Sequence, residues 1–335
     1  MKDFEYASPT TEAEVLMHLA AWPGETELIA GGTDLVGLLQ KMVITPKRVV
    51  NLLDVPSLRD VEELDGGVVS VGATVTLDTL LVHPYLNPYP ALRHAIDGIA
   101  SMQIQCQGTL GGEILQRPQC WFFRDGRGLL AAGGKLVEQG DNRHHAILGN
   151  LGAAKFVSAS RLAPALIALG ATVRVIGPSE TDEKFVPVEE LFRTPRHEGE
   201  RENTLAPGQL LTHVLLPPAD GLASATYEVR HGAGPDFPLA AAAASLRLSG
   251  GGAAGKTVQE ARIVLGQVAP TPWVSGEAAA VLRGRQVDET IAEEAGAAAV
   301  APATPLSGNE HKVQLAKVAV KRAILRAAGL ETGGF

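Results

Sequence analysis

The sequence predicts a mixed α/β protein of two or three domains. Its 335 residues exceed the length of one ordinary domain core. Apolar runs of strand length alternate with amphipathic stretches of helix length along most of the chain. Within residues 26–53, a buried strand, a glycine loop, a short helix and a second strand follow one another, which is the order of a small βαβ-like unit.

The composition excludes several classes of protein. Hydrophobic residues make up 45% and charged residues 20%, the balance of a soluble folded chain. The apolar runs are too short for a membrane span, and the N-terminus has no secretory signal, so we expect a cytoplasmic protein, periplasmic only by co-export with a partner. With 29 basic and 37 acidic residues the net charge is −8, and no basic cluster predicts nucleic-acid binding.

The first 57 residues contain the strongest local signals. Thr11 and Glu14 have the spacing of a capping box and predict the start of a helix. Residues 26–30 and 48–53 have the pattern of buried strands, and residues 36–42 form one or two helical turns between them.

The loop between these strands is the first candidate ligand site. It runs from an apolar segment through two glycines, a hydroxyl and a carboxylate: Leu28, Ile29, Ala30, Gly31, Gly32, Thr33, Asp34 and Leu35. Glycines allow the backbone to approach a ligand closely, and successive N–H groups can converge on an anion such as a diphosphate. Taken alone, this signal is weak.

The middle of the chain contains a second glycine site. A strand over residues 68–76 and helices over 77–82 and 90–100 precede the segment 108–113, which includes Thr109, Gly111 and Gly112. Two glycine pairs, each with a threonine beside it, are hard to explain as ordinary turns. If they converge, they could hold one dinucleotide from both sides.

Residues 116–152 form the least regular part of the sequence. Long loops of this kind are usually functional or disordered, and this one contains the aromatic run Trp121 to Phe123. We expect these rings to lie at a partner interface, because exposing them to water is costly. Regular structure then returns as a helix over 160–169 and strands over 172–176 and 210–216.

A third region begins near residue 219. Residues 226–230, 239–248 and 261–268 are expected to form strands or a strand and helix mixture, and the alanine run 240–244 indicates close packing. Helices are expected over residues 277–282, 290–300 and 311–328.

One motif in this region points to a different function. Residues 250–257, Gly-Gly-Gly-Ala-Ala-Gly-Lys-Thr, match the phosphate-loop pattern at every position. That motif requires a helix directly after the threonine, whereas Val258, Ile263 and Leu265 have the pattern of a strand. We therefore interpret the segment as the tip of a hairpin.

Taken together, residues 29–35 and 108–112 resemble the FAD-binding medium subunit of the molybdenum hydroxylases, the family of xanthine dehydrogenase, carbon monoxide dehydrogenase and the aldehyde oxidoreductases. The likeness continues through residues 115–125 and 142–149, which are similar to the branch of bacterial periplasmic-type aldehyde oxidoreductases. Residues 236–239 and 268–273 resemble the C-terminal domain of the family. Nearly the whole chain is covered.

The resemblance implies an α+β fold: an FAD-binding domain of the vanillyl-alcohol oxidase type, with two α/β subdomains, and a smaller α+β domain. We place the subdomains at residues 1–57 and 58–218, with the long loop 116–152 in the second, and the C-terminal domain at 219–335. It also implies FAD as the cofactor, a large molybdopterin-binding subunit that oxidises an aldehyde or N-heterocycle, and a small subunit with two [2Fe–2S] clusters. The medium subunit passes electrons onward, so no catalytic acid, base or nucleophile is expected.

The sequence departs from the family pattern at several places. Members of the related branch hold a [4Fe–4S] cluster with four cysteines in the long loop, but this chain contains only Cys106 and Cys120, so we expect no such cluster. Family members usually have Asn at Glu113, a ribityl-binding Asp at Arg161 and a Lys near the flavin at Glu228. Glu113 would place a carboxylate near a diphosphate unless it points away or is neutralised, and Arg161 could supply the neutralising charge.

The residues that we expect to contact FAD are Leu28, Ile29, Ala30, Gly31, Gly32, Thr33, Asp34, Leu35, Thr109, Gly111, Gly112, Glu113, Arg161 and Glu228. For Asp34 the alternative is a cap on the following helix. His144 and His145 are expected to pack within the loop rather than bind metal. Two functions are compatible with the sequence: an FAD-binding electron-transfer subunit, or a structural subunit that kept the fold and lost FAD.

Overall fold

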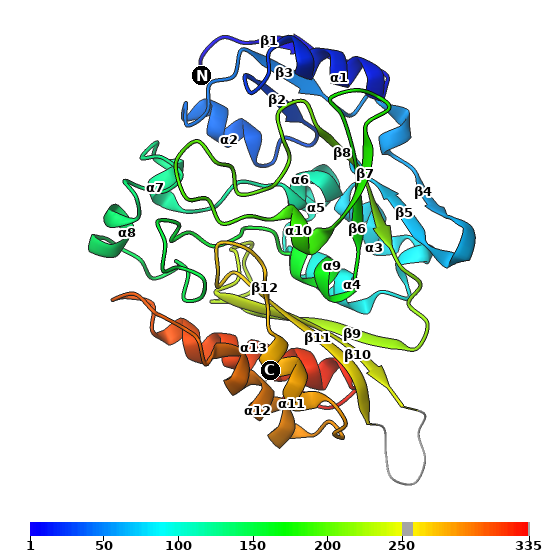
Figure 1. The fold of residues 1–335 in the computed structure, drawn as a ribbon, viewed down its shortest axis with the longest axis vertical. Helices are drawn as coiled ribbons and strands as arrows, with labels where there is room; N and C mark the ends of the chain where they lie inside the picture. Colours follow the sequence, from blue (N-terminus) through cyan, green and yellow to red (C-terminus); the bar gives the residue numbers. More distant parts are fainter. Residues whose placement is uncertain (250–256, 334–335) are drawn as a thin grey trace.

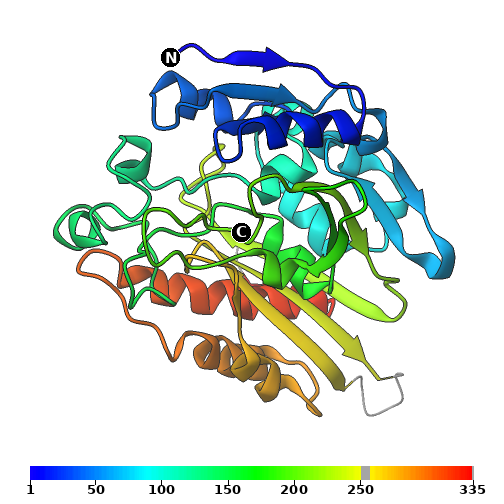
Figure 2. The same ribbon diagram turned by 45° about the horizontal axis from the view of Figure 1, so that its top comes forward.

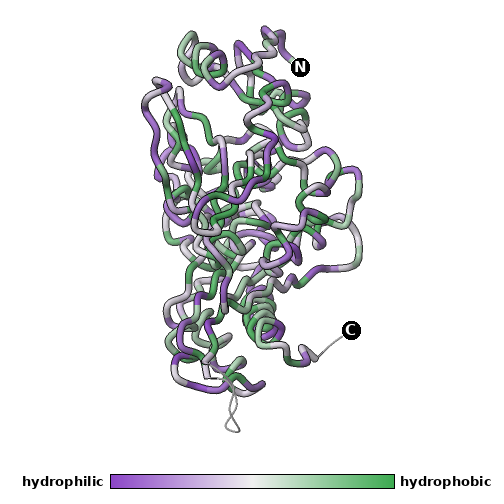
Figure 3. Tube along the Cα trace, turned by 90° about the vertical axis from the view of Figure 1, so that its right-hand side faces the viewer, coloured by the Kyte–Doolittle hydropathy of each residue, from purple (hydrophilic) through white to green (hydrophobic). Residues whose placement is uncertain are grey.

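The computed structural model describes residues 1–249 and 257–333 and contains three β-sheets. Figures 1 and 2 show the N-terminal unit at one end of the molecule, a middle domain next to it and the C-terminal sheet and helices at the other end. Figure 3 shows the molecule from the side, with its long axis vertical and the N-terminus near the top. Within the described residues, no helix is both long and apolar enough to cross a membrane.

The N-terminal unit is a small parallel sheet with the strand order β1-β3-β2. Its elements are β1 (Glu5–Ala7), α1 (Glu12–Ala21), β2 (Thr26–Ile29), α2 (Leu35–Gln40) and β3 (Arg48–Asn51). The predicted βαβ-like order is confirmed. Thr11 accepts the N–H of Glu14 at 3.2 Å, as expected of a helix cap, but the Glu14 carboxylate binds the N–H of Thr10 rather than that of Thr11.

The middle domain is built on an antiparallel sheet with the order β4-β5-β8-β6-β7. Its strands are β4 (Val61–Glu63), β5 (Val69–Gly72), β6 (Thr172–Ile176), β7 (Glu183–Pro187) and β8 (Leu210–Leu216). Its helices are α3 (Leu77–Val82), α4 (Pro90–Asp97), α5 (Met102–Gln107), α6 (Leu110–Ile114), α9 (Ala163–Ala168) and α10 (Val188–Leu191), with 3₁₀ turns at Pro56–Leu58, Asp65–Gly67 and Pro84–Leu86.

Local contacts decide where two of these elements begin and end. β5 stops at Gly72, four residues before the predicted end, where a Cβ atom would lie 2.2 Å from the carbonyl oxygen of Leu58. The second glycine segment is the first turn of helix α6, and its N-cap Thr109 accepts the N–H of Gly112 at 3.3 Å. The irregular segment 116–152 contains two short helices, α7 (Trp121–Arg124) and α8 (Lys135–Gln139).

The C-terminal sheet has the order β12-β11-β10-β9 and is antiparallel. Its strands are β9 (Leu222–Val229), β10 (Ala240–Leu248), β11 (Val258–Gly266) and β12 (Trp273–Val274), followed by α11 (Gly276–Leu282), α12 (Glu289–Val300) and α13 (His311–Ala327). Of the phosphate-loop match, residues 250–256 lie outside the described part of the chain. The residues after Thr257 form a strand and not the helix that the motif requires.

Strand β10 is buried on both faces. Ala242, Ala244 and Leu246 belong to a core shared with α11, α12 and α13, whereas Ala243 packs into the main core of the middle domain. Ser245, on the same face as Ala243, donates a hydrogen bond to the carbonyl of Ala168 at 2.6 Å. The alanine run therefore permits the close packing that the sequence indicated, and it joins the two domains through a common core.

Candidate cofactor-binding site

The first candidate loop and the second glycine segment line one cavity of about 760 Å³. All of residues 28–35 contribute to its wall, together with Thr109, Gly111 and Gly112 from the start of α6. Residues 199–201 and 203–211, the segment that leads into β8 and includes its first two residues, also contribute to the wall. The volume lies within the range of small-molecule and cofactor sites.

Glycine is required where the two loops meet. A Cβ atom on Gly31 would lie 1.6 Å from the carbonyl oxygen of Gln107, so any side chain there would force the loops apart. A Cβ atom on Gly111 would lie 2.9 Å from Cβ of Ala73. Gly32 has a φ of +71°, which L-residues with side chains rarely adopt. Gly31 therefore allows two segments, 76 residues apart in sequence, to come into direct backbone contact.

The first loop presents backbone donors to the cavity. In the part of the chain that the structure describes, the N–H groups of residues 31–34 have no hydrogen-bond acceptor. Consecutive unpaired N–H groups beside a cavity form a concave site with partial positive charge, which suits phosphate oxygens. The donor set therefore fits the diphosphate of a dinucleotide.

Asp34 lies in the cavity wall, and its carboxylate fixes the loop that follows α6. One oxygen pairs with Arg124 at 2.6 Å, and the other accepts the N–H of Arg117 at 2.8 Å. Its side chain makes no capping hydrogen bond to α2, so the helix-cap alternative is wrong. Since an arginine neutralises the carboxylate, Asp34 does not impose a net negative charge on the cavity.

Glu113 does not line the cavity. Its side chain is buried behind α6, accepts a hydrogen bond from the hydroxyl of Ser160 at 2.8 Å and receives the backbone N–H groups of Arg161 and Leu162. Burial raises the pKa of Glu113 to about 7, and these hydrogen bonds oppose the shift. The carboxylate thus points away from the diphosphate-like site toward the start of α9.

Arg161 and Glu228 are also outside the cavity wall. Their side chains form an ion pair in which 3% and 6% of their surfaces are exposed, and Arg161 also donates to the carbonyl of Gly98. Arg230 donates to the same carbonyl at 2.9 Å. The guanidinium of Arg161 therefore neutralises Glu228, which lies on strand β9. Glu113 is contacted only by the backbone N–H of Arg161 and not by its guanidinium.

The sequence did not predict several residues of the wall. Arg193 and the segment 199–211 contribute to it from a region that carried no motif. No periodicity marks such residues, because tertiary contacts alone bring them to loops that lie 80 to 180 positions earlier in the chain. Of the apolar residues that line the cavity, the sequence assigned Leu38 only to a helix and Leu52 only to a strand, and it assigned Ile44 to neither.

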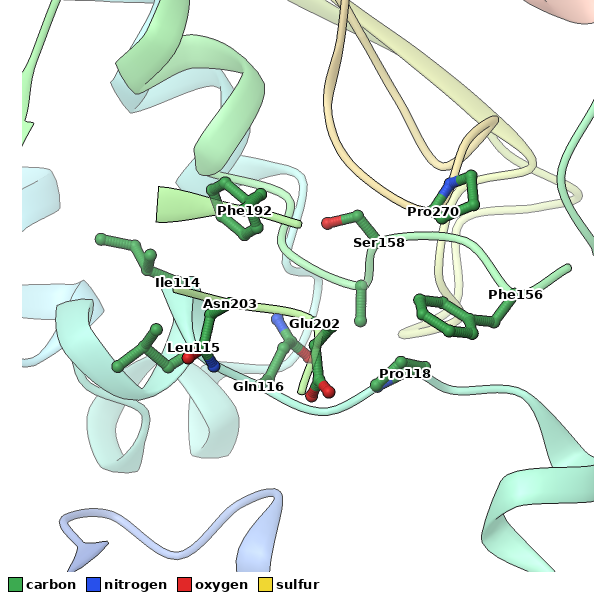
Figure 4. A pocket seen from close by; sticks show the side chains of 11 residues that line it. Ile114, Leu115, Gln116, Pro118, Phe156, Ser158, Phe192, Glu202, Asn203 and Pro270 are labelled. Atoms are coloured by element: carbon green, nitrogen blue, oxygen red, sulfur yellow. The ribbon is translucent and has the colours of Figure 1, made fainter. Parts of the chain in front are cut away.

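A second, much smaller cavity lies beside the first. Figure 4 shows Ile114, Leu115 and Gln116 from the end of α6 meeting Phe192, Glu202 and Asn203 around it. Its volume of about 10 Å³ is the space of a single water molecule. It cannot accept a cofactor, and it marks the place where the segment 192–203 packs against α6.

The long loop forms its own polar and aromatic cluster. Cys120 Sγ lies 3.1 Å from His145 Nε2, and Trp121 packs edge-on against His144 and His145. Burial lowers the pKa of His145 to about 4 and raises the pKa of the Cys120 thiol, so both groups are neutral at pH 7. Within the described residues, no group of three or more His, Cys, Asp or Glu side chains could hold a metal ion.

The aromatic run is not an exposed patch. Phe123 is buried in a cluster with Leu38 and Phe156, and Trp121 and Phe122 are half-buried within the loop. We placed these rings at a partner interface because we expected them to be exposed. Since they are buried or half-buried, their exposure no longer supports that placement.

The fold and the site together define a class: an FAD-binding domain followed by a flavoprotein C-terminal domain. Residues 2–219 match the family described as "FAD binding domain in molybdopterin dehydrogenase", and residues 225–327 match "CO dehydrogenase flavoprotein C-terminal domain". The chain belongs to this family of FAD-binding medium subunits of molybdenum hydroxylases, and FAD is the cofactor of the family.

Individual relatives cover almost the full chain. The aldehyde oxidoreductase FAD-binding subunit PaoB of Escherichia coli (strain K12) is 31% identical over 324 residues, 95% of this chain and 96% of the relative. The carbon monoxide dehydrogenase medium chain of Afipia carboxidovorans is 28% identical over 331 residues, with coverage of 97% and 96%.

Among solved structures, a chain of quinoline 2-oxidoreductase from Pseudomonas putida 86 has a TM-score of 0.75 at 25% identity, with 98% and 99% of the two chains covered. A chain of Cu,Mo-CO dehydrogenase in its cyanide-inactivated form also has a TM-score of 0.75 at 25% identity, with coverage of 97% and 98%.

Proposed function

We propose that this chain binds FAD in the 760 Å³ cavity and serves as the electron-transfer subunit of a molybdopterin-dependent oxidoreductase. The observation that carries the proposal is the convergence of two glycine segments on one cavity, with the free N–H groups of residues 31–34 in its wall. The relatives support it, because all of those named above are FAD-binding or medium subunits or chains of such oxidoreductases.

The roles of individual residues follow from the geometry. Backbone N–H groups of the first loop bind the diphosphate, Thr109 and the glycines of α6 close the opposite wall, and Asp34 holds the long loop against the site. FAD, when bound, accepts and releases electrons between iron–sulfur clusters on a small partner subunit and a final acceptor. Substrate oxidation belongs to a large molybdopterin-binding partner. We place the domain boundaries near residues 57 and 218, between the three sheets.

A second function is favoured by a different observation. Glu113, Arg161 and Glu228, which correspond to FAD-contacting positions in the family pattern, are buried and occupied with one another or with α9. A structural subunit that scaffolds its partners without FAD would show this arrangement. The glycine-lined cavity supports the first function, because a scaffold has no need to maintain it.

Flavin quantitation separates the two functions. The full chain is purified, and flavin is released with acid and measured by fluorescence against protein concentration. About one FAD per chain, or tight uptake of added FAD, is expected of the electron-transfer subunit. A chain that contains no flavin and takes up none would overturn it in favour of the scaffold.

A further inference from the structure

The charges in the wall of the large cavity are almost all neutralised by neighbouring side chains. Arg201 pairs with Glu27, Asp34 with Arg124, Arg117 with Glu202, and Glu200 with Arg196 at 3.3 Å. These pairs contribute no net charge to the site. Arg193 is the remaining charged side chain in the wall, and it forms no ion pair with any residue that the structure describes.

Arg193 is held in place although its charge is not neutralised. Its backbone N–H donates to the carbonyl of Glu202 at 3.0 Å, and one terminal guanidinium nitrogen donates to the carbonyl of Asn203 at 2.9 Å. Its Nε atom is buried and has no partner among the described residues. Among the described residues the guanidinium therefore has N–H donors without an acceptor, and their fixed planar arrangement suits the oxygens of a phosphate.

The position of Arg193 places this charge on the α6 side of the cavity. The neighbouring Phe192 packs around the small cavity with Leu115 and Gln116, the two residues that follow α6 (Figure 4). Leu115, Gln116 and Asn203 line both cavities, and Arg193, the residue after Phe192, lines the large one.

We propose that Arg193 binds the diphosphate of the dinucleotide and supplies the full positive charge that the backbone donors of the two glycine segments lack. This inference rests on the proposed function. A diphosphate is doubly negative, and a single uncompensated guanidinium in a wall of otherwise neutral pairs binds it more tightly than partial charges alone. Arg193 thus selects ligands that carry a diphosphate over those that carry only the adenosine.

Binding measurements on the full chain test the assignment. FAD is titrated by flavin fluorescence, and ADP and adenosine are used as competitors, with wild type, Arg193→Gln and Arg193→Lys. The matched control is Arg143→Gln, which removes an arginine whose partner Asp141 also lies outside the cavity wall, with 63% of its side chain exposed. Thermal unfolding confirms that each variant is folded.

We expect Arg193→Gln to weaken FAD and ADP about tenfold, with adenosine unchanged, because a charge-assisted hydrogen bond to phosphate is lost. Arg193→Lys retains part of the affinity, and Arg143→Gln binds as wild type. Equal affinity of wild type and Arg193→Gln for FAD would overturn the role of Arg193 while leaving the proposed function intact, as would an equal loss for ADP and adenosine. A wild-type chain that binds neither FAD nor ADP overturns both.

Discussion

Two neighbouring regions of the molecule differ in how their polar groups are paired: the glycine-lined cavity, and the buried charge cluster formed by Glu113, Arg161 and Glu228. Thr109, Gly111 and Gly112 at the start of α6 line the cavity, whereas Glu113, the next residue, is buried in the protein. The cavity has unpaired backbone donors in its wall, whereas Glu113, Arg161 and Glu228 are satisfied by one another, by Ser160 and by backbone groups.

The difference shows that the shape of the cavity depends on backbone contacts, whereas the charged side chains beside it form a separate set of contacts. Loop contacts such as that between Gly31 and Gln107 depend on the absence of a side chain, and they keep the cavity shape. The charged side chains bind one another instead, and the ion pair Arg161–Glu228 joins the middle domain to strand β9. Four variants test whether the two regions are independent.

The largest effect is expected from breaking the buried pair. Arg161→Ala leaves the buried carboxylate of Glu228 with only the more distant Arg230, whose Nε lies 4.0 Å away, so the free energy of unfolding should fall by about 4 kcal/mol, measured by urea denaturation. The double variant Arg161→Met/Glu228→Met removes both charges and should recover most of this loss. If Arg161→Ala is as stable as wild type, the pair does not stabilise the junction between the domains.

The next variant acts on the cavity. Gly31→Ala places a Cβ atom against the carbonyl of Gln107, so we expect a loss of about 3 kcal/mol and the loss of FAD binding. The matched control is Gly37→Ala in α2, where a Cβ atom meets nothing within 4 Å and the helix should gain about 0.5 kcal/mol. Retention of FAD by folded Gly31→Ala would show that the loop contact is not needed for the site.

The third test uses the titration of Glu113. Its folded-state pKa of about 7 lies above the ordinary value of 4.5, so the folded chain binds more protons between these values, and stability falls as pH rises from about 4.5 to 7. Glu113→Gln cannot titrate. The stability of wild type relative to this variant should therefore decline across that window, by roughly 3 kcal/mol. Parallel pH profiles of the two proteins would contradict burial of an ionisable Glu113.

The smallest effect is expected at Asp34. Asp34→Asn weakens the contact with Arg124, so thermal unfolding should show a loss of about 1 kcal/mol, because the pair is only partly exposed. Asp125→Asn is the control, since its pair with Arg127 is more than half exposed and should leave stability unchanged. FAD binding should persist in Asp125→Asn and weaken in Asp34→Asn, because Asp34 holds the long loop against the cavity. A stability loss as large in Asp125→Asn would exclude a specific role for Asp34.

Elements with strong periodicity were predicted closely. Strands β6 and β8 match the predicted residues 172–176 and 210–216, and α13 begins at the predicted residue 311. β1 and β7 were missed, because a three-residue strand carries almost no pattern and β7 is largely exposed. Helices α7 and α8 were missed because each spans little more than one turn, which is too short to show a helical pattern of apolar residues.

The site could be predicted in its backbone but not in its side chains. Glycines and their neighbouring threonines are readable in sequence, and they do line one cavity. The orientation of Glu113 could not be read, because it depends on hydrogen-bond donors that begin 47 positions later, at Ser160. Arg193 was missed because its importance comes from the pairing of all the other charges in the wall, which only the folded chain reveals.

Strand β10 has a consequence for how this protein forms in the cell. Ala243 and Val264 belong to the core of the middle domain, yet they are synthesised after residue 219. The first 219 residues therefore leave the ribosome with an incomplete core and an exposed apolar face. We expect the N-terminal two thirds of the chain to wait for β10 and β11 before its core reaches the final packing.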